Sequence, residues 1–170
     1  MGLPFERRDA GIFGLSDFAR FALSLFILLP LVSFIHSLGH SFMAALFGGW
    51  SRFALGRGKV LFCIGAITVH RIYFLDSNVR YSRLRWNNRF THFMVHAGGI
   101  LFNIGSVLLL NYLISQGIMK DRPYLFLYSY FSIWFAFISL IPVDYGNGSY
   151  SDGMNLYYIL KHREFPQLYN

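Results

Sequence analysis

Three long stretches without a charged side chain constrain this chain more than any other feature of its sequence. Residues 21–47, 90–116 and 124–143 contain no Lys, Arg, Asp or Glu and are rich in Phe, Leu and Ile. As a helix, either of the first two stretches would be roughly 40 Å long, and about 20 apolar residues suffice to cross a bilayer core of roughly 30 Å. We therefore predict three transmembrane helices and an integral, multi-pass membrane protein.

The composition excludes several other classes of protein. Hydrophobic residues make up 55% of the chain and charged residues 14%, and the mean hydropathy is +0.43. These values exclude intrinsic disorder, and Cys63 as the single cysteine excludes an internal disulfide. The net charge of +7 does not indicate nucleic-acid binding here, because membrane proteins collect Lys and Arg in cytoplasmic loops that face anionic lipid.

The segment between the first two spans, residues 50–89, has a different character. Gly56, Gly58 and Gly65 interrupt two β-prone runs, residues 59–64 and 66–74, which predicts a β-hairpin or small sheet. Open strand edges cannot face lipid, so this sheet must lie at the interface or be covered by helices. A loop and short helix are expected over residues 144–160. We predict a single domain over residues 1–170, an all-α membrane fold with a small membrane-associated β-hairpin.

The distribution of basic residues predicts an orientation. Ten Lys and Arg residues lie in the 50–89 loop and the C-terminal tail, against five on the opposite side. Because basic loops stay in the cytoplasm, the N-terminus is expected outside and the 50–89 loop inside.

Two histidines inside the first span carry the strongest indication of chemistry. His36 and His40 are four residues apart, so a helix places both rings on one face, where they can grip a metal ion from one side. Polar residues at membrane depth are costly and usually belong to a functional or packed site. Asp152, in Tyr-Ser-Asp-Gly after the third span, is a third potential ligand. The alternative is that the histidines only bond to neighbouring helices.

Four segments together resemble the site-2 protease family of intramembrane zinc metalloproteases. Residues 36–48, His-Ser-Leu-Gly-His-Ser-Phe-Met-Ala-Ala-Leu-Phe-Gly, are similar to the family's His-Glu-x-x-His helix. Residues 98–103, Gly-Gly-Ile-Leu-Phe-Asn, keep the glycine and asparagine of an Ala-Gly-Pro-x-x-Asn motif. Residues 139–142, Ser-Leu-Ile-Pro, followed by Asp152-Gly153, resemble Asn-Leu-x-Pro with Asp-Gly. The glycine-interrupted sheet matches the family's membrane-associated hairpin.

The resemblance implies roles for particular residues. His36, His40 and Asp152 would be zinc ligands, with a fourth position left for water or substrate, as catalytic zinc sites keep. Asn103 would line the cleft and hold a substrate's extended backbone. The sheet would guide a membrane-embedded peptide or protein partner.

The sequence departs from the family at one catalytic position. The glutamate that follows the first histidine, and that acts as general base, is Ser37 here. A hydroxyl cannot replace it, and loss of a general base removes about two to four orders of magnitude in rate. Either Ser37 is natural, and the protein is a pseudoprotease that binds partners or scaffolds a larger membrane complex, or it is an inactivating change in a working protease. Asp144 could either replace the missing general base or cap a loop, and its position favours the loop cap.

A second histidine pair leaves a competing interpretation. His92 and His96 repeat the four-residue spacing on the second span, and two helices with paired histidines can hold haem between them. The alternative is that His92 sits at the interface and His96 bonds to a neighbouring backbone.

Overall fold

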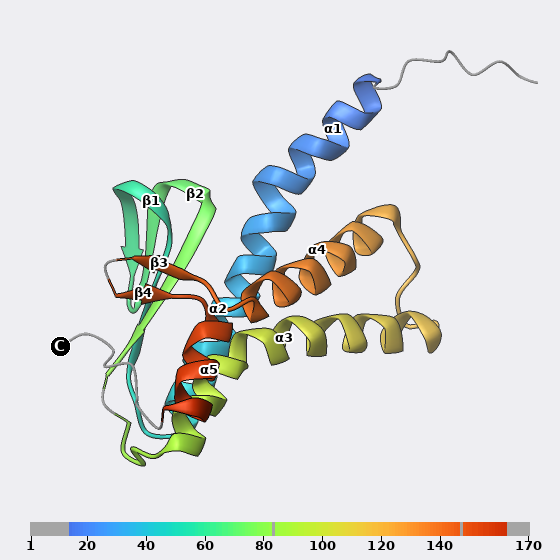
Figure 1. Ribbon diagram of the computed structural model, residues 1–170. Coiled ribbons are helices and arrows are strands. Elements are labelled where there is room, and N and C mark those ends of the chain that lie inside the picture. Colours follow the sequence, from blue (N-terminus) through green and yellow to red (C-terminus); the bar gives the residue numbers. More distant parts are fainter. Residues whose placement is uncertain (1–13, 83, 147, 163–170) are drawn as a thin grey trace, which may run out of the picture.

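A helical bundle with a β-hairpin along one side makes up the molecule (Figure 1). The computed structural model describes residues 14–82, 84–146 and 148–162. The helices are α1 (Leu15–Leu23), a π-helical turn (Ser24–Leu28), α2 (Leu29–Leu46), α3 (Arg89–Ser115), α4 (Pro123–Leu140) and α5 (Asp152–Lys161). The strands are β1 (Ser51–Ile64), β2 (Ile67–Tyr81), β3 (Asp144–Gly146) and β4 (Ser149–Tyr150).

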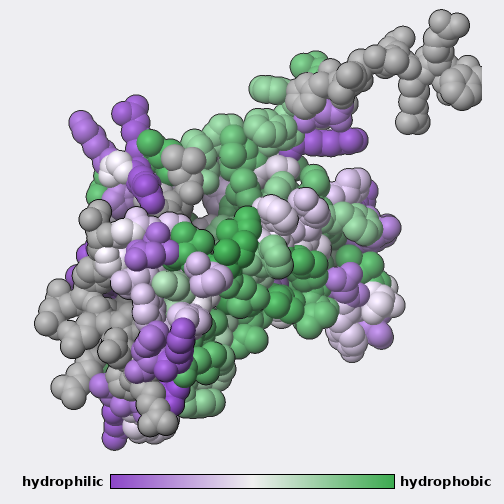
Figure 2. All heavy atoms as spheres, in the orientation of Figure 1, coloured by the Kyte–Doolittle hydropathy of each residue, from purple (hydrophilic) through white to green (hydrophobic). Residues whose placement is uncertain are grey.

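Within the part of the chain that the structure describes, three helical segments are long and apolar enough to cross a membrane, as predicted. They are Asp17–Leu46, which joins α1 to α2, then α3, and α4. In Figure 2, apolar side chains gather over these helices, whereas polar ones gather over α5, the hairpin and the loop between α3 and α4. The all-α prediction is only partly correct, because the structure combines helices with a sheet that covers residues 51–81.

The π-helical turn lies next to the proline of the first span. Pro30 has no N–H to donate and its ring crowds the carbonyl one turn earlier, so the helix must adjust there. The adjustment is a widened turn, in which Leu29 N–H donates to the carbonyl of Ser24. The irregularity beside Pro30 is thus a π-helical turn within a continuous helix.

The hairpin is longer and more curved than predicted. The first residues of β1 pair with the last residues of β2, from Ser51 with Tyr81 to Leu55 with Ser77. Beyond them β1 bends at Gly56 and Gly58, whose φ angles of +81° and +91° are ones that side chains rarely tolerate. A Cβ on Gly56 would also collide with the backbone of β2. The end of β2 lies beside α2, where the metal-ligand candidates lie, and Ser33 of α2 donates to the Ser77 hydroxyl at 2.6 Å.

Small residues set the spacing of α2 and α3. A Cβ on Gly98 would lie 2.6 Å from the carbonyl oxygen of Gly39 and 2.8 Å from Met43 Cγ, so only glycine permits this approach. Close packing of the two helices at this contact therefore depends on small residues. It holds the histidine-bearing face of α2 against α3.

Both ends of α5 are fixed, which places Asp152 at its first turn. At the N-terminus, Ser151 Oγ accepts from Met154 N–H and donates to the carbonyl of Ile141 at 2.7 Å. At the C-terminus, Arg89 donates to the carbonyls of Ile159 and Leu160 at 2.8 and 2.9 Å. α5 is thereby tied to the end of α4 and the start of α3.

Candidate metal centre

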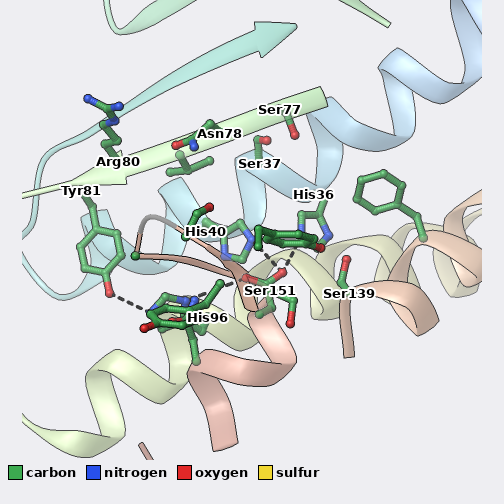
Figure 3. A pocket seen from close by; sticks show the side chains of 18 of the residues that line it. His36, Ser37, His40, Ser77, Asn78, Arg80, Tyr81, His96, Ser139 and Ser151 are labelled. Atoms are coloured by element: carbon green, nitrogen blue, oxygen red, sulfur yellow. Dashed lines mark hydrogen bonds and ion pairs between the residues drawn. The ribbon is translucent and has the colours of Figure 1, made fainter. Parts of the chain in front are cut away.

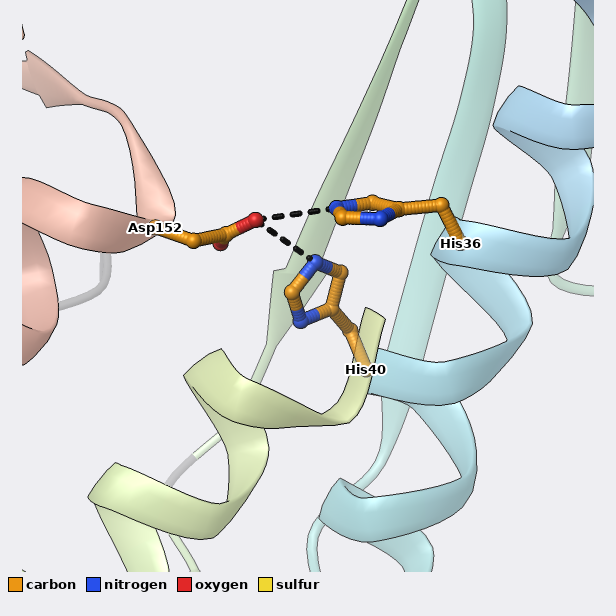
Figure 4. A group of neighbouring side chains, drawn as sticks. All are labelled: His36, His40 and Asp152. Atoms are coloured by element: carbon orange, nitrogen blue, oxygen red, sulfur yellow. Dashed lines mark hydrogen bonds and ion pairs between the residues drawn. The ribbon is translucent and has the colours of Figure 1, made fainter. Parts of the chain in front are cut away.

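Three predicted ligands, distant in sequence, converge at one point. His36 and His40 project from successive turns of α2, and Asp152 reaches them from α5 (Figure 4). The Asp152 Oδ2 atom lies 2.9 Å from His36 Nε2 and 3.4 Å from His40 Nε2. One ligand atom from each residue lies within 4.8 Å of the other two. This group could hold a metal ion.

Glycine on α3 makes room for the two rings. A Cβ on Gly99 would lie 2.5 Å from His36 Nε2 and 2.6 Å from His40 Nε2. On α5, Gly153 permits close packing against the end of α4, because a Cβ there would collide with the backbone of Leu140. The glycine next to Asp152 is therefore needed for α5 to approach α4.

Hydrogen bonds give His40 the tautomer that a metal ligand needs. Its Nδ1–H donates to the carbonyl of Val95 at 2.7 Å, so in the neutral ring the lone pair is on Nε2, which faces the Asp152 carboxylate. These two acceptors, 3.4 Å apart, repel unless a positive charge, either a proton on Nε2 or a metal cation, lies between them. A metal cation there satisfies both, and the ring–carbonyl bond is the usual support for a ligating histidine.

Asn103 supports His36 from behind. It is 0% exposed, its Nδ2 lies 3.4 Å from His36 Nδ1, and its Oδ1 is buried without a hydrogen-bond partner. Metal ligation through Nε2 requires the proton on Nδ1, and turning the amide by half a rotation presents Oδ1 to that proton. The oxygen and nitrogen of an amide are distinguished only by their bonding. In the turned orientation, the Asn103 oxygen accepts the Nδ1 proton of a His36 that ligates a metal through Nε2. Asn103 is not among the residues that line the cavity beside the group, and its role toward a substrate stays a prediction.

The carboxylate is held in its charged form. Burial raises the pKa of Asp152, but attraction to His40 and hydrogen bonds from the surrounding histidines hold that pKa well below its usual range. Asp152 is therefore an anionic candidate ligand throughout the physiological pH range.

A cavity of about 820 Å³ opens beside the group. Figure 3 shows residues of α2 facing the end of β2, with His96 of α3 below them. Ser37 lines this cavity and is 1% exposed. Among the side chains that the structure describes, Asp152 is the only acidic one on the wall. Asp144 is exposed and its Oδ1 accepts from Gly146 N–H at 2.8 Å, the predicted role of a loop cap.

The second histidine pair contacts the end of β2, and one of its rings also approaches the Asp152 carboxylate. His96 does not simply bond to a neighbouring backbone, because its Nδ1 lies 3.9 Å from Asp152 Oδ1 and its Nε2 lies 3.3 Å from the Tyr81 hydroxyl. His92 is 7% exposed and lies between Tyr81 and Asn87. The sequence did contain a signal for His96, since it shares a helical face with Gly99 and Asn103 at spacings of three and seven.

The haem hypothesis does not fit this arrangement. α2 and α3 approach so closely at Gly39 and Gly98 that a single Cβ would collide there. A porphyrin needs a gap between the two helices, and Asp152 stands between the rings that would be axial ligands.

Comparison with known proteins identifies a membrane-protein relative. A Bacillus subtilis (strain 168) protein named "Uncharacterized membrane protein YwmF" is 42% identical over 153 residues, which cover 90% of this chain and 96% of the relative. The chain belongs to the family of this membrane protein. No family model and no solved structure matches it. With its three apolar helices, the protein is assigned to the lipid bilayer.

Proposed function

We propose that this protein is a site-2-protease-like membrane protein that binds zinc through His36, His40 and Asp152 and binds a membrane-embedded peptide without cleaving it efficiently. The observation that carries the proposal is the convergence of these three ligand atoms within 4.8 Å beside a large cavity. Two imidazoles and one carboxylate are a donor set typical of zinc sites with one open position.

The cavity offers an extended peptide a place beside the metal group. Residues 77–81 of β2 run along it, and β1 pairs with the same stretch. A peptide lying along this strand would adopt the extended form that β-strand recognition uses. When bound, zinc would supply Lewis-acid polarisation of a carbonyl group. The chain's own residues would orient the peptide and exclude lipid.

The chemistry of Ser37 supports binding without efficient cleavage. It occupies the place where the site-2 proteases carry their general base, and its hydroxyl stays protonated at neutral pH. No described carboxylate other than the ligand Asp152 lies on the cavity wall to replace the base. We expect turnover to be reduced by about two to four orders of magnitude, which leaves a pseudoprotease suited to a scaffold or to a subunit of a membrane complex.

Restoring the base tests this proposal. The purified protein, reconstituted in liposomes with a labelled single-span peptide, is compared with Ser37→Glu, the size-matched Ser37→Gln, and Ser37→Glu combined with His36→Ala. We expect wild type to bind the peptide, by energy transfer between labels, and only Ser37→Glu to cleave it, at a rate about 10²–10⁴-fold above wild type.

Two results would overturn the proposal. Metal-dependent cleavage by wild type at the rate of Ser37→Glu would show that the protein is a working protease. A Ser37→Glu variant that retains metal and neither binds nor cleaves the peptide would show that the cavity is not a peptide site.

The orientation completes the proposal. The N-terminus lies outside and the hairpin lies in the cytoplasm, because the hairpin side carries ten of the fifteen Lys and Arg residues. The basic loop then faces anionic headgroups.

A further inference from the structure

The stretch of β2 beside the peptide cavity has one face toward the helices and one face away from them. Tyr81 is 6% exposed, and Ser77 accepts a hydrogen bond from Ser33 of α2 at 2.6 Å, so these two side chains point toward the helices. Successive side chains of a strand point to opposite faces, which places Asn78 and Arg80 on the outer face, and both are exposed. In Figure 3, Arg80 and Tyr81 extend from opposite sides of β2.

A basic pocket opens on this outer face. Arg52 of β1 pairs with Arg80 of β2, and directly opposite residues of a sheet have their side chains on the same face. Ala54 of β1 pairs with Asn78 and also with Thr68, so three strand segments lie side by side here. All five residues line a pocket of about 330 Å³, and no acidic side chain that the structure describes lies on its wall. The pocket therefore suits an anionic group.

The basic pocket adjoins the peptide cavity. Asn78 and Arg80 line both of them. Within the described part of the chain, residues 77–81 pair with β1 alone, and the cavity runs along this stretch. A peptide that pairs with the remaining edge would continue the sheet. Every second side chain of that peptide would then lie on the face that carries Arg52 and Arg80.

We propose that the basic pocket binds a carboxylate of the peptide, so that the site selects peptides with a Glu or Asp side chain beside Arg80. This inference rests on the peptide binding proposed above. Opposite charges on neighbouring strands stabilise a sheet, and like charges destabilise it. A guanidinium group stays charged and holds a carboxylate through two parallel hydrogen bonds. Arg57, which lines the peptide cavity, adds a further positive charge that disfavours basic peptides.

The acidic side chain would also fix the register of the peptide. A slip of one residue turns every side chain of a strand to the other face, which would remove the carboxylate from Arg52 and Arg80. A peptide held in one register presents the same residue to the metal group each time it binds. The open position of the metal and the place of Ser37 are unaffected, because the pocket lies on the face turned away from the helices.

Matched peptides test this selectivity. Each is a labelled single-span peptide whose segment next to the span alternates two residue types over about six residues, a typical strand length. One peptide alternates Glu and Thr, and the other alternates Gln and Thr. Binding to the full-length protein in neutral phosphatidylcholine liposomes is measured by energy transfer between labels. We expect the Glu peptide to bind about three- to tenfold more tightly than the Gln peptide.

Substitutions of the arginines test the cause of this preference. Arg52→Gln and Arg80→Gln should each reduce the preference, and Arg80→Glu should make a peptide that alternates Lys and Thr bind more tightly than the Glu peptide. Arg71→Gln is the matched control, because Arg71 is an exposed arginine of β2 that lines neither the pocket nor the cavity. It should keep the wild-type preference. Thermal unfolding in detergent shows which variants are folded.

The outcomes separate this inference from the proposed function. Equal binding of the Glu and Gln peptides by wild type would overturn the inference and leave peptide binding standing. Binding of neither peptide would refute the peptide site itself, and the inference with it. Because wild type decides between these cases, a misfolded variant does not obscure the result.

A lipid phosphate is the competing occupant of the basic pocket. Fluorescent phosphatidylglycerol is therefore added to the same liposomes. Enrichment of this lipid around wild type that is lost in Arg52→Gln and Arg80→Gln, together with no preference for the Glu peptide, would assign the pocket to lipid and overturn the inference. We expect equal lipid enrichment in all variants.

Discussion

Gly98→Ala is predicted to weaken metal binding through the spacing of two helices. The added Cβ would lie 2.6 Å from the Gly39 carbonyl oxygen, whereas ordinary contact begins at 3.4 Å. The helices must therefore separate by roughly 0.8 Å at this point, because backbone atoms on both sides cannot turn away. The same displacement would stretch the bond from His40 to the Val95 carbonyl, now 2.7 Å, to roughly 3.5 Å, beyond hydrogen-bond range.

Metal sites tolerate much less displacement than that. Ligand distances must hold to within about 0.2 Å, so we expect zinc affinity to fall about 10–100-fold, the usual effect of disturbing the groups that support ligands. Overpacking of this kind should also destabilise the fold by about 1–3 kcal/mol. Competition with a chromophoric zinc chelator and thermal unfolding in detergent measure the two effects.

Gly105→Ala is the matched control. Gly105 lies on the same helix, and a Cβ there would have no neighbour within 4 Å. Removing this helix glycine should stabilise the fold by up to about 1 kcal/mol and leave zinc affinity unchanged. Unchanged affinity in Gly98→Ala, or an equal loss in Gly105→Ala, would refute the claim that the Gly39–Gly98 contact positions the ligands.

Three further predictions concern the site and the topology. Asn103→Leu should lower zinc affinity about 10–100-fold by removing the partner of His36, whereas Asn111→Leu, on the same helix, should not; equal affinities in a chelator titration would contradict this. Zinc affinity should rise with pH up to the histidine range, near pH 6.5, because Asp152 stays ionised while protons compete for the imidazoles; a titration flat from pH 5 to 7 would refute that competition. Cys63, which is exposed on the hairpin, should react with an impermeant maleimide only after permeabilisation, and labelling of intact cells would reverse the proposed orientation.

The membrane helices and the three-residue group were predictable because local patterns encode them. Uncharged runs indicate spans directly, and the spacing of His36 and His40 fixes their common face. Asp152 was predicted as a ligand only because it belongs to an Asp-Gly pair that follows the third span. The reason for that pair is visible only in three dimensions, where Gly153 packs against the end of α4.

The contacts of His96 and the extent of β2 could not be predicted from the sequence. The two paired histidines of α3 were interpreted within their own helix, but their partners come from the end of β2 and from α5. The extent of β2 was also underestimated, because residues 76–78, Asp-Ser-Asn, are types depleted in strands. Ser77 and Asn78 pair with Leu55 and Ala54 of β1, and this pairing overrides the local preference.

The most direct test of the account is the metal content of the purified protein. Zinc per chain is measured by elemental analysis for wild type, His36→Ala and Asp152→Ala, with a visible spectrum of the same samples. The account predicts about one zinc ion per wild-type chain, its loss in both variants, and no Soret band. Wild-type protein without zinc, or variants that keep it, would contradict the metal centre from which the proposed function follows.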